Sequence, residues 1–433
     1  MTTAVFLLFG SFAVLMILGL PIAFAIGLST AATFLLFMSF EQSLFIVAQQ
    51  MASGLDSFTL LAIPFFILAG NIMNRGGIAM RLIAFALVLG GRLPGALAHC
   101  NIIANMMFGS ISGSAVAAAA AVGGVMAPLQ KKEGYDPAYS AAVNIVSCPT
   151  GLLIPPSSAF IVYSLITGGT SIAALFVAGY VPGILMGLAL MVAAGIMAWR
   201  RGYPVAPRSS LCQVWQAARD AILPLGLIVV VMGGIISGIF TATEASAAAV
   251  VYTLFLALVW YREIGLKDLP AIMIESAVTT ATVLLMIGAS IAMSRVMAFG
   301  GIPFLISDAL LSLSDNPLVI LLLINIALLV VGTFMDMTPA LLIFTPIFLP
   351  VVTDLGMDPV HFGIMITLNL CIGICTPPVG SALFIGCSVG GTSIASVIRP
   401  LLPFFAVLFG ILLLVTYVPG ISLFLPRLLG VYQ

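Results

Sequence analysis

The chain has 433 residues, of which 62% are hydrophobic and only 6% are charged. Soluble globular domains carry about 25% charged residues, so this composition excludes a water-soluble fold. The 14 basic and 14 acidic residues cancel, and the net charge gives no sign of nucleic-acid binding. Apolar stretches of bilayer-spanning length, about 20 residues, recur along the chain and predict an all-α polytopic membrane protein.

The N-terminal apolar stretch runs from Val5 to Phe40 without a basic leader, and it is too long for the core of a signal peptide. We therefore interpret it as mature structure, with two crossings that meet near Pro21. The next segment, 41–56, is amphipathic and predicts an arm helix that lies along the membrane surface.

A re-entrant hairpin is predicted at 96–130, where apolar half-helices flank the sequence FGSISGS. A broken helix is predicted at 138–166, because SCPTGLLIPPSS interrupts an apolar crossing. With their scaffold helices, these elements form a first unit of five crossings, residues 1–203. Residues 204–219 are predicted to be a cytoplasmic linker.

The second unit, residues 220–433, repeats this order of elements. It contains a predicted arm helix at 265–280. A hairpin follows at 317–352 around GTFMDMTP, and a broken helix at 359–387 around LCIGICTPPVGS.

An internal duplication explains this order. A shift of 222 positions aligns residues 134–173 with 356–395 without a gap, and twelve of these forty positions are identical. Because each unit has an odd number of crossings, the second copy should lie inverted relative to the first. Inverted repeats are typical of secondary transporters, whose sites lie at the repeat interface near the bilayer midplane.

The positions of the basic residues predict the orientation. With the N-terminus outside, twelve Lys and Arg residues face the cytoplasm and two face outward, as the positive-inside rule favours. Both termini should then be periplasmic. The two basic residues predicted outside are Arg295 and Arg427.

The helix breakers carry the chemical signal. Irregular backbone at membrane depth occurs only where it is buried in protein or lines a watery cavity. A single Gly or Pro would more simply be a packing notch or kink, but four breaks in symmetric pairs favour a functional site. Free half-helix N-termini can hold an anionic group.

Unwound carbonyls and neighbouring hydroxyls can bind a small hard cation. Sodium fits such neutral oxygens better than calcium or magnesium, which usually recruit carboxylates. The hydroxyls at the breaks belong to Ser110, Ser112, Ser114, Thr150, Thr333 and Thr376.

Two acidic residues lie within apolar surroundings. Asp336 is at a hairpin tip, where an intramembrane carboxylate suggests function. It could equally assist a helix start, with Thr338 as N-cap before Pro339. For Glu244 a structural hydrogen-bonding or capping role is favoured.

Other classes of protein fit less well. An intramembrane enzyme is disfavoured, because the sequence has neither an HExxH motif nor paired acids at transmembrane depth. Metal and disulfide chemistry are disfavoured, because the six cysteines lie mostly in apolar segments. An ion channel is a remote alternative, since re-entrant loops occur in channels too.

Several motifs resemble the large membrane subunit (M) of tripartite ATP-independent periplasmic (TRAP) transporters along essentially the whole chain. They are GSISGS, LIPPSSAFIVY, GIFTATEASA, GTFMDMTP and GICTPPVGSALF. The resemblance implies a sodium-driven, elevator-type importer of an organic anion in the bacterial inner membrane. Sialic acid is favoured by overall likeness, followed by C4-dicarboxylates or other sugar acids.

The resemblance also implies partners: a small four-helix membrane subunit (Q) as a separate polypeptide, and a periplasmic substrate-binding protein (P). Sodium is the coupling ion, and no organic cofactor is expected. The alternative is a stand-alone sodium-coupled anion transporter that needs no binding protein.

By the same resemblance, two sodium sites and a substrate site can be assigned. The substrate should meet Ser112, Ser157 and Asp336. The first sodium site should involve Ser110, Ser112, Ser114, Pro149 and Gly151. The second should involve Gly332, Thr333, Gly373 and Thr376.

Overall fold

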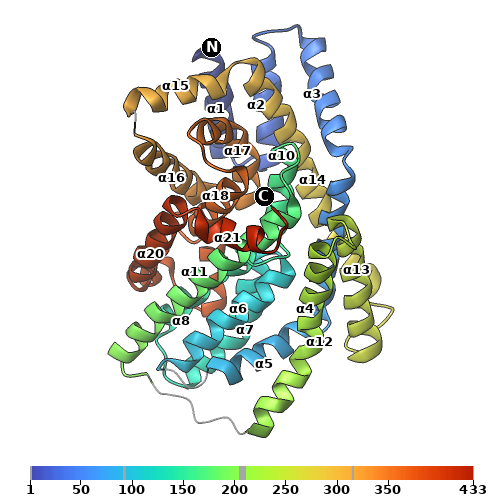
Figure 1. Cartoon of the computed structure of the whole chain (residues 1–433), viewed down its shortest axis with the longest axis vertical. Coiled ribbons are helices and arrows are strands. Elements are labelled where there is room, and N and C mark those ends of the chain that lie inside the picture. The colour runs from blue at the N-terminus through green and yellow to red at the C-terminus, as the bar shows by residue number, and fades with distance from the viewer. Residues whose placement is uncertain (1, 91–93, 204–210, 315, 433) are drawn as a thin grey trace.

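The computed structural model describes residues 2–90, 94–203, 211–314 and 316–432. Within these ranges the regular secondary structure is entirely helical, which confirms the predicted all-α fold class. Figure 1 shows an elongated body with α3, α4, α12, α13 and α14 along one side and α16 and α20 on the other.

The helices of the first half range from 4 to 29 residues in length. They are α1 (Thr2–Ile17), α2 (Ile22–Phe34), α3 (Phe40–Leu55), η1 (Phe58–Leu61), α4 (Ala62–Arg75), α5 (Ile78–Gly90), α6 (Ala96–Ser112), α7 (Ala115–Lys132), α8 (Pro137–Ser147), α9 (Thr150–Leu153), α10 (Ser158–Ile166) and α11 (Ile172–Arg200).

The second half contains the longest helix of the described chain. Its elements are α12 (Leu211–Ile236), α13 (Ala242–Leu254), the π-helical η2 (Phe255–Trp260), α14 (Leu269–Phe299), α15 (Ile302–Leu313), α16 (Pro317–Phe334), α17 (Met337–Asp354), α18 (Pro359–Gly373), α19 (Ser381–Gly390), α20 (Ile394–Tyr417) and α21 (Gly420–Leu428).

Eight of the described helices are long and apolar enough to cross a membrane. A ninth span results if the pair Pro137–Leu153 and Ser158–Ile166, which bends by 52°, counts as one crossing. The chain is therefore a multi-pass membrane protein.

The two halves place their helix boundaries at the same offset. α6 ends at Ser112 and α7 begins at Ala115. Shifted by 222 positions, α16 ends at Phe334 and α17 begins at Met337. These boundaries agree with a duplication, while the inverted orientation of the copies stays a prediction.

The two broken helices also begin alike. Asp136 and Asp358 are N-caps whose carboxylates accept backbone N–H groups, at 3.1 Å from Ala138 and 2.7 Å from Val360. A proline follows each at the first helical position, where its missing N–H leaves no hydrogen bond unmade.

Glu244 belongs to a capping box at the start of α13. The Thr241 hydroxyl accepts the N–H of Glu244 at 3.3 Å, and the Glu244 carboxylate accepts the N–H of Thr241 at 2.7 Å. This reciprocal pair confirms the predicted capping role.

The two predicted arm helices differ in the structure. α3 covers the segment 41–56, but the segment 265–280 is not a separate helix, because α14 runs through it without interruption. The sequence explains the difference: GLDS at 54–57 ends α3, whereas ESAVTTATV at 275–283 contains no Gly or Pro.

The predicted linker 204–219 is also shorter than expected. Residues 204–210 lie outside the described residues, and 211–219 already belong to α12. The stretch LCQVWQAAR has no helix breaker, so helix extends into it.

Polar contacts connect the two halves on the side of α4 and α14. Asn71 donates to the Ser276 hydroxyl at 2.8 Å, and Arg75 forms an ion pair with Glu275 at 2.6 Å. Because this ion pair is exposed, it contributes little to stability.

The broken helices cross in the interior. The thiol of Cys371 lies 3.7 Å from the carbonyl oxygen of Pro149, and that of Cys375 lies 3.0 Å from the carbonyl oxygen of Ile145. Both thiols are free and buried. The contacts hold α8, α9 and α18 together at the level of the breaks.

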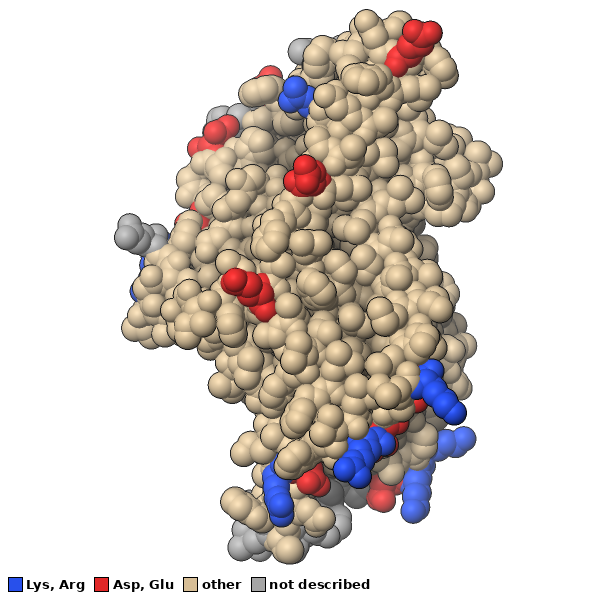
Figure 2. All heavy atoms as spheres, turned by 90° about the vertical axis from the view of Figure 1, so that its right-hand side faces the viewer, with Lys and Arg blue, Asp and Glu red and all other residues tan. Residues whose placement is uncertain are grey.

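Charge is unevenly distributed over the surface. On the face drawn in Figure 2, most Lys and Arg gather toward the lower end, whereas Asp and Glu are spread more widely. Most of this face is uncharged, as expected for a surface in contact with lipid.

Candidate functional site

Each hairpin tip touches the break of a broken helix through a pair of glycines. A methyl group on Gly151 would lie 2.3 Å from the Cα of Gly109, and one on Gly373 would lie 2.6 Å from the Cα of Gly332. Only glycine permits so close an approach of two backbones. The structure thus brings the predicted Gly332 and Gly373 together, and pairs Gly151 with Gly109, which the sequence analysis missed.

The hydroxyls of the first tip remain close to its backbone. Ser110 is buried and donates to the carbonyl of Met107 at 2.9 Å. Ser112 makes only a long contact, 3.5 Å, with the carbonyl of Ser114. Ser114 caps α7 by accepting the N–H of Ala117 at 3.2 Å. A hydroxyl that donates its proton keeps lone pairs for a cation.

The facing break of the first half is buried. Pro149 and Gly151 lie at the start of α9, and the hydroxyl of Thr150 donates to the carbonyl of Ser147 at 2.6 Å. Ser158, not among the predicted residues, donates to the carbonyl of Gly113 at 3.5 Å. The first predicted sodium site is thus a group of neutral oxygens from α6, α7 and the broken helix.

The second group has the same character but is more open. Thr333 donates to the carbonyl of Val330 at 2.7 Å, and Thr376 to that of Ile372 at 2.8 Å. Val379, beside this break, is 48% exposed, whereas the residues of the first break are buried. The two predicted sodium sites therefore differ in their access to the surface.

Asp336 lies at the second tip with an exposed carboxylate that accepts the hydroxyl of Ser381 at 3.1 Å. It occupies the N-cap position of α17, but its side chain makes no cap hydrogen bond. The helix begins at Met337, so the prediction of Thr338 as N-cap before Pro339 is wrong. Ser381, at the start of α19, is a partner that the sequence analysis did not identify.

The three predicted substrate residues make no hydrogen bond to one another in the described chain. Ser157 is fully buried at the start of α10, and its hydroxyl has no hydrogen-bond partner in the described chain. Ser112 is half-buried. Within the described residues no hydrogen bond joins Asp336 to either serine.

A buried amide network supports the first group. The side-chain nitrogen of Asn105 lies 2.8 Å from Asn101 Oδ1, 3.0 Å from Asn144 Oδ1 and 2.7 Å from Ser147 Oγ. These contacts connect α6 to α8. They fix the hairpin beside the broken helix that it faces.

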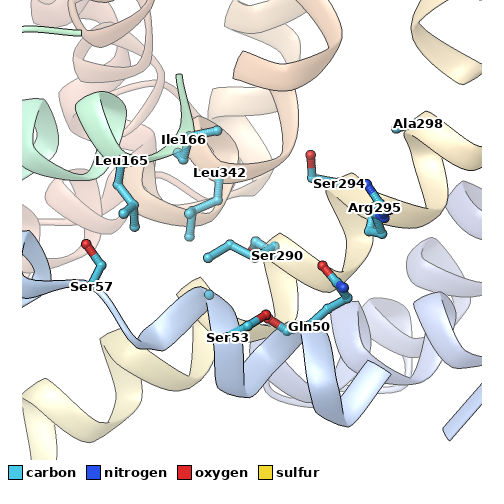
Figure 3. Close-up of a pocket in the computed structure, with 12 residues that line it drawn as sticks. Gln50, Ser53, Ser57, Leu165, Ile166, Ser290, Ser294, Arg295, Ala298 and Leu342 are labelled. Carbon is cyan, nitrogen blue, oxygen red and sulfur yellow. The ribbon is translucent and has the colours of Figure 1, made fainter. Parts of the chain in front are cut away.

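A separate cavity of about 420 Å³ lies outside both groups. Figure 3 shows polar side chains of α3 and α14 on one side of it and Leu165, Ile166 and Leu342 on the other. None of the predicted sodium or substrate residues lines it. The only sequence sign of this site was Arg295, one of two basic residues predicted outside.

In the described part of the chain, no group of three or more His, Cys, Asp or Glu side chains could hold a metal ion. The available ligands are hydroxyls and backbone carbonyls. Such neutral oxygens suit a monovalent cation better than a divalent one.

A bundle of membrane-crossing helices, with paired breaks and hairpin tips packed on them, defines a polytopic membrane transporter. The fold agrees with a solved transporter, YdaH of Alcanivorax borkumensis. The TM-score is 0.62 at 14% identity, covering 88% of this chain and 89% of that one.

The chain belongs to the family described as tripartite ATP-independent periplasmic transporter, DctM component, which residues 9–421 match. It is 57% identical to protein YgiK of Salmonella typhimurium, over 98% of this chain and 97% of the relative. It is 40% identical to the sialic acid TRAP transporter large permease protein SiaM of Vibrio cholerae, over 96% of each chain. It is 41% identical to the C4-dicarboxylate TRAP transporter large permease protein DctM of Pseudomonas aeruginosa, over 94% of each.

Proposed function

We propose that this chain is the large membrane subunit of a sodium-driven importer of an organic anion. Sialic acid is the favoured substrate, and a C4-dicarboxylate or another sugar acid is next. Relatives of similar identity carry the names of sialic acid and C4-dicarboxylate permeases, and both substrates are carboxylates. The observation that carries the proposal is the pair of glycine contacts that place neutral oxygens of each hairpin tip beside a helix break.

Sodium is proposed as the coupling ion because of the ligands at these two groups. The hydroxyls of Ser110, Thr333 and Thr376 each donate to a helix carbonyl, so their lone pairs point away from that bond. A proton would instead require a titratable group, and Asp336 is the only acid at either tip.

The substrate is proposed to meet Ser112, Ser157 and the region of Asp336. The buried hydroxyl of Ser157 has no partner in the described chain, a state that a bound ligand would relieve.

We propose an elevator movement, in which one part of the molecule slides against a fixed part. The fixed part would comprise α2, α3, α4, α12, α13 and α14, which pack on one another across the two halves. The moving part would comprise the hairpins and broken helices. Movement of an inverted repeat around its site is the usual basis of alternating access.

The proposed setting is the bacterial inner membrane with both termini periplasmic. A small four-helix membrane subunit would widen the fixed part, and a periplasmic binding protein would deliver the anion. The distribution of basic residues in the sequence supports this orientation.

The test is uptake by the purified chain, its small subunit and its binding protein in liposomes. Labelled N-acetylneuraminate and labelled succinate should be offered under an inward sodium gradient, and separately under a proton gradient in sodium-free buffer. We expect uptake only with sodium. Equal uptake with protons alone would exclude sodium coupling, and uptake without the binding protein would favour a stand-alone transporter.

A further inference from the structure

The cavity lies between α3 and α14 on one side and α10 and α17 on the other. The first side is a polar wall and the second an apolar wall. Gln50 and Ser53 of α3, Ser57 after it, and Ser290, Ser294 and Arg295 of α14 contribute the polar wall. Leu165 and Ile166 at the end of α10 and Leu342 of α17 contribute the apolar wall. Its volume of about 420 Å³ lies within the range, roughly 300–1,000 Å³, of pockets that enclose small molecules.

Arg295 is the one charged group of this lining. Its side chain is exposed, and within the described ranges it takes part in no ion pair or hydrogen bond. A guanidinium presents parallel N–H donors that match the two oxygens of a carboxylate. The site thus has positive charge without an acid that neutralises it.

Ser290 provides an independent indication of a ligand. It is 2% exposed, it lines the cavity, and its hydroxyl has no hydrogen-bond partner in the described chain. A buried hydroxyl without a partner costs about 1–3 kcal/mol, so a bound polar group or water should satisfy it. The remaining lining hydroxyls and the Gln50 amide can bind neutral polar groups of the same ligand.

We infer that this cavity is a second anion site, which receives a small organic carboxylate before or after it reaches the hairpin tips. Arg295 would pair with the carboxylate and Ser290 with a further oxygen, while Leu165, Ile166 and Leu342 cover the carbon skeleton. The inference rests on the proposed import of an organic anion. One wall belongs to the proposed fixed part and the other to the proposed moving part. Binding of a ligand in the cavity should therefore depend on the distance between these parts.

The first experiment measures the electrostatic character of the cavity without transport. Ser294→Cys is introduced with Cys212→Ser, since Cys212 is the exposed cysteine and the others are buried. The full chain with its small subunit is placed in phosphatidylcholine nanodiscs and labelled with an anionic or a cationic methanethiosulfonate. We expect the anionic reagent to be favoured, and Arg295→Gln to lower the anionic-to-cationic rate ratio at least about fivefold.

The second experiment uses carboxylates as protectants of the same cysteine. N-acetylneuraminate and succinate are compared with their neutral methyl esters at equal concentration. An acid should slow labelling and its ester should not, and Arg295→Gln should abolish the protection. Ser290→Ala should weaken it, and Arg427→Gln, the matched arginine control, should leave it unchanged.

Three outcomes would overturn the inference. Equal protection by acid and ester would mean binding that does not depend on the carboxylate charge. A rate ratio unaffected by Arg295→Gln would mean that this arginine does not determine the charge of the cavity. Protection that appears only when phosphatidylglycerol is added would mean a lipid headgroup site. These assays need no sodium gradient, so they test the cavity site independently of transport. A failure of sodium-driven uptake would contradict the proposed function but not the anion site in the cavity.

Discussion

At the scale of single residues, the glycines at the two breaks control how near the hairpin tips can come. Neither Gly151 nor Gly373 has a positive φ, so the requirement is one of space rather than of backbone conformation. A side chain at either position would meet backbone atoms of the tip, which cannot rotate away. Small residues at helix contacts are a common solution in membranes, where close packing replaces the hydrophobic effect.

We expect Gly151→Ala and Gly373→Ala to abolish uptake and to lower the thermal midpoint of the purified protein. Overpacking of this kind typically costs about 1–3 kcal/mol. Gly124→Ala and Gly410→Ala are matched controls, because a methyl group there meets nothing within 4 Å. Wild-type uptake by both break variants would show that the tips need not approach so closely.

Ser112→Ala and Thr376→Ala should raise the sodium concentration for half-maximal uptake. If each ion–oxygen contact is worth as much as a hydrogen bond to a charged group, about 1.5–3 kcal/mol, the rise should be about 10- to 150-fold. Thr353→Ala is the control, since this hydroxyl also donates to a helix carbonyl, at 2.8 Å, but at the far end of α17. Unchanged sodium dependence in both variants would contradict the site assignment, provided that their membrane levels match the wild type.

At the scale of helices, buried amides join each hairpin to a broken helix. Asn105 connects α6 to α8, and in the second half Asn369 of α18 donates to Asn325 of α16 at 2.9 Å. At the shift of 222 positions, Asn369 corresponds to Ser147, which Asn105 contacts at 2.7 Å, whereas Asn325 corresponds to Ile103 and not to Asn105. The two halves therefore share one position of this contact and differ in the other. Hydrogen bonds between helices in a membrane are modest individually, but an unpaired buried partner is costly.

Asn105→Ala should destabilise the hairpin contact, because it removes the donor shared by Asn101, Asn144 and Ser147. We expect a loss of about 1–3 kcal/mol, measured as a lower thermal midpoint in detergent. Asn74→Ala serves as control, since Asn74 is exposed on α4. Equal midpoints for the two variants would mean that the network does not stabilise the fold.

At the scale of the whole molecule, the proposed division into fixed and moving parts requires that one of them resist displacement. The α4–α14 side carries the exposed ion pair of Arg75 and Glu275 and many apolar side chains that face outward, such as Val278 at 63% exposure. Such a surface fits lipid or another membrane helix. Apolar contact gains little over lipid, so a partner must bind there by close packing and a few polar pairs.

The chain should therefore be inactive in transport without a separate small membrane subunit. The measurement is co-expression with and without the gene for that subunit, followed by sodium-driven uptake with the cognate binding protein. Arg75→Glu, on the proposed docking side, should weaken co-purification more than Arg427→Glu. Full uptake by this chain and the binding protein alone would refute the requirement.

The class of fold and the positions of the breaks could be predicted from the residue pattern alone. Composition excluded water solubility, and hydrophobic length predicted helices. The Gly and Pro motifs marked the breaks, because backbone conformation there depends on local residues. The capping role of Glu244 was equally local, since it involves only residues three positions apart. Family motifs were then enough to identify the chain as a TRAP large subunit.

Which parts of the chain meet could not be predicted, because these contacts depend on packing in three dimensions. The pairing of Gly109 with Gly151, the contact of Asp336 with Ser381, and the assembly of a cavity around Arg295 all join residues distant in sequence. The continuity of α14 was missed because an amphipathic start was interpreted as a separate arm, although no breaker follows it. Periodicity describes the face of a helix, whereas contacts depend on how helices pack in three dimensions, which no local pattern records.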